Sequence, residues 1–389
     1  MILYLSSVTS YKLFNNLVNE KKILTGHQAQ KFNSLVVKGL CEFDDVTCIS
    51  NLPFEREAEY NTYFKLQEGK ACFYILPNKK NKLLRKLSNL LYFRKLIKKV
   101  IKENKIEAII CDAINPLASL MAIYFARRLK VPTIALVTDI PEYMDEGRET
   151  VFTKLTSKLL KKYNGYVLLT EAMNELVNSK NRPYIIMEGL CEPTVEEKKL
   201  PTNKDKKILL YSGSLSKGVG VEMLLQAFKK LNLEGWELHI YGNGELKSVV
   251  SDCQKSFPAI QYKGVVPNDQ VVQRQKEADV LINPRPTKIR YGNVSFPSKI
   301  MEYMVSGTAV LTTRLPGIPK EYFNYVYLIE NDSIEGMKKA IKNVTLLSDE
   351  ERNDKGNSAR QYVISEKSCL IQCARIVQLL AEIKGIKNV

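Results

Sequence analysis

Hydrophobic residues in this chain form short continuous runs that alternate with longer stretches of helical spacing. Continuous apolar runs indicate strands buried on both faces, which are typical of a parallel sheet covered by helices. The strands expected on this basis are residues 2–5, 71–77, 108–112, 131–139, 166–171, 207–211, 236–241, 260–264, 279–285 and 309–311. The pattern therefore predicts an α/β fold of repeated strand–helix units, with helices at 117–128 and 221–231 among them.

A stretch rich in proline, lysine and glutamate divides the chain into two halves. Residues 178–205 contain Pro183, Pro193 and Pro201, a composition typical of a linker, and the strand–helix alternation restarts after it. With 389 residues the chain is also too long for one typical core. We therefore expect two Rossmann-like domains, residues 1–190 and 191–365. Residues 358–387 are predicted to be helical, and the C-terminal part, 366–389, is expected to pack against either domain or cross back to the first.

The composition is that of a globular protein, with 45% hydrophobic and 26% charged residues. No run of 18 uncharged apolar residues predicts a membrane-spanning helix, and the N-terminus lacks the basic leader of a signal peptide, so a cytoplasmic location is expected. The eight cysteines are scattered without a C-x-x-C pair. That spacing favours reduced thiols over a disulfide framework or a zinc site, and no metal is expected.

The net charge of +16 predicts an anionic partner. Lysines and arginines concentrate in residues 79–105, where leucines and isoleucines recur among them at helical spacing. Such a segment favours an anionic membrane surface. It is also compatible with a surface helix whose leucines pack on its own sheet while its lysines face water. Nucleic acid is disfavoured, because no aromatic platform or known binding motif accompanies the charge.

The most informative stretch begins at residue 295 and reads S-F-P-S-K-I-M-E-Y-M-V-S-G. Pro297 suits the first position of a helix, and Gly307 falls where a C-terminal cap belongs. The first-turn N–H groups, the helix dipole and Lys299 together suit a phosphate. Glu302 lies one turn further in and can accept hydrogen bonds from vicinal hydroxyls such as those of a ribose. Alternatively, Lys299 and Glu302 form an ordinary solvated pair on a helix surface.

Glycine-rich loops follow the first two strands of the second half. The loop 212–220 contains Gly213 and ends before a helix, with Lys217 as a point charge, and Gly242 and Gly244 follow the next strand. Glycines let the backbone approach an anion closely. Neither the P-loop nor the G-x-G-x-x-G pattern is present, so these segments can also be plain turns between a strand and a helix.

Two aspartates end neighbouring predicted strands of the first half. Asp112 and Asp139 follow apolar runs, and ligands in open α/β sheets gather at the carboxyl ends of strands. The alternatives are a helix N-cap or a turn aspartate. His27 and Gln28 lie in a polar loop of the same half and are expected either to face an acceptor or to form a surface turn.

In order and position, the loop with Lys217, the Gly242–Gly244 segment and the stretch from Phe296 to Glu302 resemble the donor-binding domain of family 4 glycosyltransferases, which have the GT-B fold. The resemblance implies two Rossmann-like domains facing each other across a cleft. It implies retaining sugar transfer from a nucleotide sugar, with UDP as the favoured nucleotide, to a saccharide or lipid-linked saccharide. The leaving diphosphate would be stabilised without a metal or other cofactor. The Phe-Pro-Ser-Lys version is similar to bacterial members that build capsular, exopolysaccharide or O-antigen repeats.

The resemblance also assigns roles to residues. Glu302 matches the second of two family glutamates, the one that holds the ribose; the first would fall at Val294, next to Asn293. Ser214 stands where the family often has an arginine, and we hypothesise that Arg285 replaces it. Expected donor-binding residues are Gly213, Ser214, Lys217, Gly242, Gly244, Arg285, Asn293, Phe296, Pro297, Ser298, Lys299 and Glu302. Expected catalytic residues are Asp139, Lys217, Lys299 and Glu302, and expected acceptor-side residues are His27, Gln28 and Asp112.

Two other functions fit the same residues. A nucleotide-sugar epimerase of this fold would share the phosphate and ribose site but would need no acceptor. A membrane-surface scaffold that kept the fold and lost activity would explain the absent glutamate at Val294.

Overall fold

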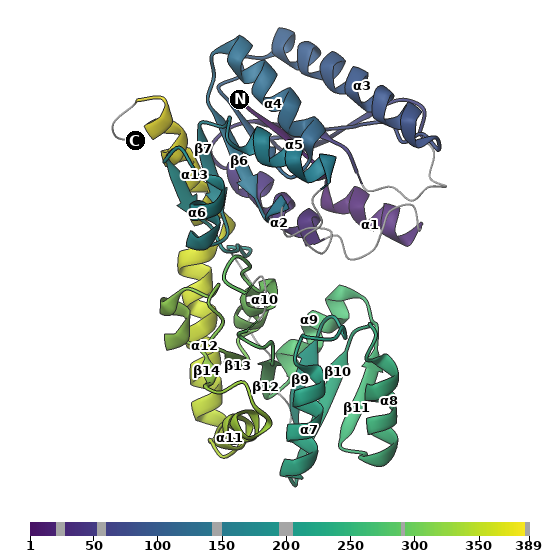
Figure 1. Cartoon of the computed structure of the whole chain (residues 1–389), viewed down its shortest axis with the longest axis vertical. Coiled ribbons are helices and arrows are strands. Elements are labelled where there is room, and N and C mark those ends of the chain that lie inside the picture. The colour runs from purple at the N-terminus through teal and green to yellow at the C-terminus, as the bar shows by residue number, and fades with distance from the viewer. Residues whose placement is uncertain (21–27, 53–59, 142–149, 194–204, 289–291, 386–389) are drawn as a thin grey trace. The chain divides into compact units, whose positions relative to one another are not determined.

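The computed structural model describes residues 1–20, 28–52, 60–141, 150–193, 205–288 and 292–385. The chain divides into two compact units (Figure 1). Unit 1 consists of Met1–Leu190 with Cys369–Val389, and unit 2 consists of Cys191–Ser368.

In the described part of unit 1, the strands form one eight-stranded sheet in the order β3-β4-β2-β1-β5-β6-β7-β8. All neighbours are parallel except β3 and β4. The strands are β1 (Ile2–Ser6), β2 (Val46–Ser50), β3 (Phe64–Glu68), β4 (Ala71–Ile75), β5 (Ala108–Asp112), β6 (Thr133–Val137), β7 (Gly165–Leu168) and β8 (Tyr184–Ile186). The helices are α1 (Tyr11–Asn19), α2 (Gln28–Leu40), α3 (Lys82–Glu103), α4 (Pro116–Leu129), α5 (Val151–Leu160), α6 (Glu171–Val177) and α13 (Cys369–Ile383).

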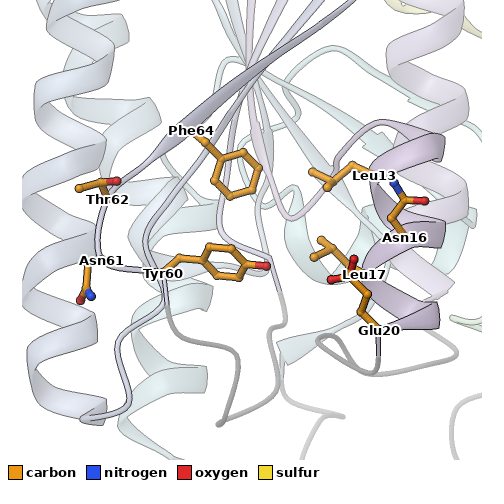
Figure 2. A pocket seen from close by; sticks show the side chains of 8 residues that line it. All are labelled: Leu13, Asn16, Leu17, Glu20, Tyr60, Asn61, Thr62 and Phe64. Carbon is orange, nitrogen blue, oxygen red and sulfur yellow. The ribbon is translucent and has the colours of Figure 1, made fainter.

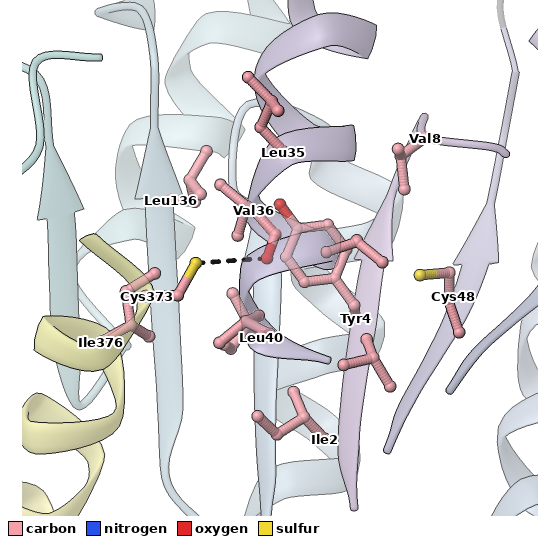
Figure 3. Packing of buried hydrophobic residues seen from close by; sticks show 14 of the residues in the cluster. Ile2, Tyr4, Val8, Leu35, Val36, Leu40, Cys48, Leu136, Cys373 and Ile376 are labelled. Atoms are coloured by element: carbon pink, nitrogen blue, oxygen red, sulfur yellow. Dashed lines mark hydrogen bonds between the residues drawn. The ribbon is translucent and has the colours of Figure 1, made fainter. Parts of the chain in front are cut away.

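Helices cover both faces of this sheet. One core cluster joins Tyr4 of β1 to Val36 of α2 and to Cys373 and Ile376 of α13, and the thiol of Cys373 donates a hydrogen bond of 3.3 Å to the carbonyl of Val36 (Figure 3). On the opposite face, α3 and α4 contact β2 and β1, and α5 packs beside α4 (Figure 1). Both faces of the central strands are therefore buried, as the continuous apolar runs predicted.

In unit 2, the described strands form a parallel six-stranded sheet in the order β11-β10-β9-β12-β13-β14. Its strands are β9 (Lys207–Ser212), β10 (Trp236–Tyr241), β11 (Ile260–Gly264), β12 (Val280–Asn283), β13 (Ala309–Thr313) and β14 (Tyr327–Ile329). Its helices are α7 (Val221–Leu231), α8 (Lys247–Ser256), α9 (Asn268–Glu277), α10 (Ser298–Ser306), α11 (Ile334–Thr345) and α12 (Asp349–Lys367), with a 3-10 helix η3 (Lys320–Asn324). α7 and α11 pack together over one core, whereas α10 packs against α9, α12 and β13.

The predicted α/β fold with two Rossmann-like units is confirmed. The single helix expected over residues 358–387 is wrong: α12 ends at Lys367, Ser368 adopts an extended conformation (φ −64°, ψ 153°), and α13 starts at Cys369. The break lets α12 pack in unit 2 and α13 in unit 1. The expected linker 178–205 includes β8, and its residues 194–204 lie outside the described part of the chain.

Candidate functional site

The helix that the sequence singled out is α10. It begins at Ser298, one residue later than predicted, with Pro297 as the N-cap (φ −74°, ψ 102°). In the described chain no side chain caps its first turn, so N–H groups there remain available to an anion. The helix ends at Gly307, which adopts the left-handed conformation expected of a C-cap glycine (φ 74°). The sequence thus folds locally as the capping signals predicted, apart from the shift in its start.

Lys299 extends from the first turn of α10 to the end of β9. Its Nζ donates a hydrogen bond of 2.9 Å to Oη of Tyr211 and lies 4.3 Å from the centroid of that ring. A Cβ built on Gly213 would lie only 1.9 Å from Lys299 Nζ, and Gly213 has a φ of +148°. Gly213 therefore leaves room for the lysine, and the fold brings together two residues predicted to bind the donor.

The electrostatics around Lys299 favour an anion. The pKa of Lys299 is lowered to about 8, mainly by burial and also by the positive charge of Arg285, whereas Glu302 opposes the shift. Burial also lowers the pKa of the half-buried Arg285, which interacts electrostatically with Tyr211. Two crowded and partly desolvated cations are stabilised by a bound negative charge. A diphosphate at the start of α10 would supply that charge.

Glu302 is half-buried and held by a polar network that the sequence did not reveal. Gln275 of α9 donates from Nε2 to Oε1 of Glu302 at 2.7 Å and to Oγ of Ser212 at 3.0 Å. The N–H of Ser212 donates to Oη of Tyr303 at 3.0 Å. α9, α10 and the end of β9 are thereby tied together, which fixes the direction of the carboxylate. The spacing of residues in sequence could not predict this network, because its members lie up to 91 positions apart.

The glycines of the two loops pack against each other. A Cβ on Gly242 would lie 1.8 Å from the carbonyl oxygen of Gly213, and a Cβ on Gly244 would lie 2.5 Å from the carbonyl carbon of Leu215. The N–H of Leu215 donates to the carbonyl of Asn243 at 2.9 Å. Close packing between the loops explains why glycine occupies positions 242 and 244, whether or not a ligand approaches there.

The other expected donor residues fall into two groups. Lys217, Ser214, Asn293 and Ser298 are exposed. In contrast, the motif residues Phe296 and Pro297 are buried, as is Val294 at the position of the absent glutamate.

The buried members of the motif anchor the helix. The ring of Phe296 packs 5.4 Å from the ring of Tyr322, which in turn packs 5.3 Å from Tyr362 of α12. Phe296 thus fixes the start of α10 against α12, a structural contribution that the sequence did not distinguish from ligand contact.

In unit 1, Asp112 and Asp139 lie at the carboxyl edge of the sheet, as predicted: Asp112 is the last residue of β5, and Asp139 lies two residues after the end of β6. The pKa of Asp112 is raised to about 6, mainly by burial; a hydrogen bond from the backbone of Ile114 opposes the shift, and the charge of Asp139 adds to it, so the two carboxyl groups are close enough to interact. Oδ1 of Asp112 is buried without a hydrogen-bond partner in the described chain. The N-cap of α4 is Asn115, which accepts from the N–H groups of Leu117 and Ala118, so the N-cap interpretation of Asp112 is wrong.

The remaining acceptor-side residues are described only in part. His27 lies outside the described residues, and Gln28 is the first residue of α2, described by its backbone alone.

A pocket of about 480 Å³ in unit 1 was not predicted (Figure 2). It lies between α1 and the segment that leads into β3, and none of the expected site residues lines it. Its lining combines the rings of Tyr60 and Phe64 with the amides of Asn16 and Asn61 and with Leu13, Leu17, Glu20 and Thr62. Within the described ranges, no group of three or more His, Cys, Asp or Glu residues could hold a metal ion.

Comparisons with known proteins show what the chain resembles. Residues 193–362 match the model of the family "Glycosyl transferases group 1". Sucrose-phosphate synthase from Thermosynechococcus elongatus shares the fold with a TM-score of 0.69 and 12% identity over 100% of both chains. HepE from Anabaena, solved in complex with UDP, gives 0.66 and 10% identity over 98% of this chain and 99% of that chain. A UDP-forming α,α-trehalose-phosphate synthase from Burkholderia xenovorans gives 0.66 and 12% over the same shares.

A search of curated protein sequences found no match. The two Rossmann-like units and the structural neighbours show the GT-B fold. The family match concerns residues 193–362 alone, which are similar to the group 1 glycosyl transferase domain.

Proposed function

We propose that this protein is a retaining glycosyltransferase that moves a sugar from a UDP-sugar to a saccharide acceptor, carried on a lipid, in bacterial surface polysaccharide synthesis. The observation that carries the proposal is the meeting of Lys299, Arg285 and the open first turn of α10, with Glu302 one turn further in.

The donor would bind from phosphate to ribose along α10. The N–H groups of the first turn and the two cations accept the diphosphate, since both the helix dipole and the charges favour an anion there. Glu302 comes three residues after Lys299, which is about 4.5 Å further along the helix axis. It therefore lies beyond the phosphates and within reach of the ribose hydroxyls. The hydrogen bond from Gln275 directs the carboxylate and leaves the half-buried group partly accessible.

Catalysis of this reaction depends mainly on stabilising the negative charge of the leaving diphosphate, rather than on a covalent intermediate with the enzyme. As the bond between the sugar and the diphosphate breaks, negative charge grows on the leaving phosphate, and preorganised donors lower its energy. The acceptor oxygen forms the new bond on the same face of the sugar, and its proton passes to the leaving phosphate or to a positioned carboxylate. Asp139 is the proposed contact to the sugar or acceptor, and Lys217 a further contact to the diphosphate. No metal or other cofactor is required by this proposal.

The choice of UDP is supported by two neighbours of the same fold. One was solved in complex with UDP and another forms UDP. A thermal-shift panel of UDP-, GDP-, ADP- and dTDP-sugars tests the choice, because a ligand bound only by the folded state raises the melting temperature. We expect UDP-sugars to give the largest shift and a Lys299→Met variant to lose it. Equal absence of any shift with all four would refute the proposed donor site.

A lipid-linked acceptor and a peripheral place at the inner face of the cell membrane are proposed from residues 79–105. None of the described helices is long and apolar enough to cross a bilayer. In α3, Leu96 and Ile97 pack in the core, but Leu83, Leu84, Leu87, Leu90 and Leu91 are exposed. The interpretation that all these leucines pack on their own sheet is therefore wrong for the first half of α3, and the exposed leucines support a membrane contact.

The second candidate is an inactive scaffold of the same fold, which the buried Val294 favours because no carboxylate stands where the family has one. Slow hydrolysis or transfer from any nucleotide sugar would exclude it. A nucleotide-sugar epimerase is separated by comparing turnover with and without a lipid-linked glycan, because only a transferase needs the acceptor.

A further inference from the structure

Three neighbouring helices of unit 1 expose large apolar side chains within their first three turns. α3, α4 and α5 cover one face of the sheet, with α4 in contact with both others (Figure 1). The exposed residues are Leu83, Leu84, Leu87, Leu90 and Leu91 of α3, Leu120 and Tyr124 of α4, and Val151, Phe152 and Leu155 of α5. The exposed fraction reaches 67% for the side chain of Leu91 and 85% for that of Val151, so these two side chains do not pack in the core. We call this set the apolar band.

The topology places the apolar band at one edge of the unit. α3 follows β4, α4 follows β5 and α5 follows β6, and these three strands run in the same direction. Each helix therefore starts near the carboxyl edge of the sheet and runs back along its face. Since the exposed apolar residues lie in the first three turns, the band begins at the edge that holds Asp112 and Asp139 and extends from there along the helices.

Exposed cations are most frequent in the later turns of the same helices, although Lys86 of α3 and Lys154 of α5 are also exposed among the apolar residues. Those in the later turns are Arg94, Lys95, Lys98, Lys99 and Lys102 of α3, Arg127 and Arg128 of α4, and Lys158 of α5, followed by Lys161 and Lys162. In sequence the three helices contain a single carboxylate, Glu103, which lies 4.0 Å from Lys99. We call this set the basic band; it lies behind the apolar band, further from the carboxyl edge.

We infer that the two bands together seat unit 1 on an anionic lipid bilayer, with the apolar band of α3, α4 and α5 among the acyl chains and the basic band against the headgroups. The inference rests on the proposed function and deepens it, because it adds α4 and α5 to the contact made by residues 79–105 and fixes its orientation. An apolar strip beside a cationic one matches the layered chemistry of a bilayer interface. A second copy of the chain would instead bring two basic bands together, and like charges repel.

The orientation has a consequence for the acceptor. With the carboxyl edge of the sheet at the headgroup level, Asp112 and Asp139 meet a saccharide attached directly to a membrane lipid, without a long soluble spacer. Contact by three helices rather than one also restricts rotation of unit 1 about α3.

Vesicle sedimentation tests the inference with matched pairs of substitutions. Phe152→Ser with Leu155→Ser removes the α5 part of the apolar band without changing charge, and Leu87→Ser with Leu91→Ser removes part of α3. Val249→Ser with Leu346→Ser is the control, since these residues are 40% and 74% exposed in unit 2. We expect wild type and control to bind vesicles of phosphatidylcholine mixed equally with phosphatidylglycerol, and not phosphatidylcholine alone. Each of the two double variants in the apolar band should bind the anionic vesicles about tenfold or more weakly than wild type.

The outcomes separate this inference from the proposed donor site. If the α5 pair binds anionic vesicles as well as wild type, or if neutral vesicles bind equally, the inference is wrong. UDP binding measured without vesicles should be the same in wild type and in the α5 pair; failure of UDP binding in both would refute the donor site and leave the membrane result standing. A wild-type dimer that the α5 pair converts to a monomer in light scattering would show a chain-to-chain interface instead and overturn the inference.

Discussion

The side-chain amide of Gln275 donates a hydrogen bond of 2.7 Å to Oε1 of Glu302. Gln275 is fully buried, and its Nε2 also lies 3.0 Å from Oγ of Ser212, so the carboxylate is held by a group that cannot easily move. A buried positioning residue on α9 thus sets the direction of a carboxylate on α10. From the sequence alone Glu302 could be an ordinary surface residue, but this hydrogen bond orients its carboxylate to accept hydrogen bonds from a ligand.

Gln275→Met should weaken UDP binding by about tenfold to a hundredfold, because a hydrogen bond to a charged group contributes roughly 1.5–3 kcal/mol and fixes Glu302. The substitution also removes the buried Oε1 that has no partner within the described ranges, so folding stability should change less than affinity. Gln273→Met is the matched control, since Gln273 is exposed on the same helix. Calorimetric titration with UDP measures both variants, and equal affinities would remove Gln275 from the site.

Lys299 should make UDP binding depend on pH. Its pKa is about 8 in the free protein, and a bound diphosphate stabilises the charged lysine. Binding therefore takes up a proton above that pH, and affinity should fall by up to about tenfold per pH unit as the pH rises from about 8 toward 9. Below about pH 7 the lysine is already charged, and affinity should be flat with respect to this group.

The control for this pH dependence is a change of the lysine itself. Lys299→Arg keeps the charge throughout the range and should flatten the profile, whereas Lys299→Met should bind weakly at every pH. A profile in Lys299→Arg that is as steep as in wild type would assign the titration to another group.

Gly213→Ala should displace Lys299 and reduce UDP affinity. The added Cβ would lie 1.9 Å from Nζ, so the lysine must leave its hydrogen bond with Tyr211. Gly218→Ala is a matched control on the same loop, because Gly218 also has a positive φ (+85°) but has nothing within 4 Å of the added carbon. Both variants place a side chain at a positive φ, which costs on the order of 1–3 kcal/mol, so UDP affinity rather than stability reports the collision. Equal affinities would contradict the position of Lys299.

Asp112→Asn should stabilise the protein at neutral pH. Burial raises the pKa of Asp112 to about 6 in the folded state. The folding stability contributed by the protonated Asp112 is therefore fully present below the unfolded pKa and is lost as the pH rises through about 6. At pH 7 and above, the buried charge costs on the order of 3 kcal/mol, which the asparagine avoids. Chemical unfolding at acid and neutral pH should therefore show an advantage of the variant only at neutral pH. A pH-independent difference would contradict the raised pKa.

The sequence predicted those parts of the fold and site that depend on local signals. Runs buried on both faces located the central strands, and Pro297 and Gly307 located α10 to within one residue. It did not predict the break at Ser368, because no glycine or proline marks it and only packing in two different units explains it.

The contacts that shape the site could not be read from spacing. Tyr211 and Lys299 are 88 positions apart, and Gln275 and Glu302 are 27 apart, so only the folded sheet brings them together. The leucines of α3 show another limit of the sequence. Their helical spacing can be read from it, but which of them are exposed follows only from the folded structure.

Calorimetric binding of UDP and of 2′,3′-dideoxy-UDP to wild type and to Glu302→Gln tests the central claim most directly. The claim is that the start of α10 holds the diphosphate and Glu302 holds the ribose hydroxyls. Wild type should prefer UDP by about tenfold or more, and Glu302→Gln should lose most of that preference while still binding the diphosphate. A variant that discriminates between the two nucleotides as strongly as wild type, or a wild type that binds neither, would contradict the account.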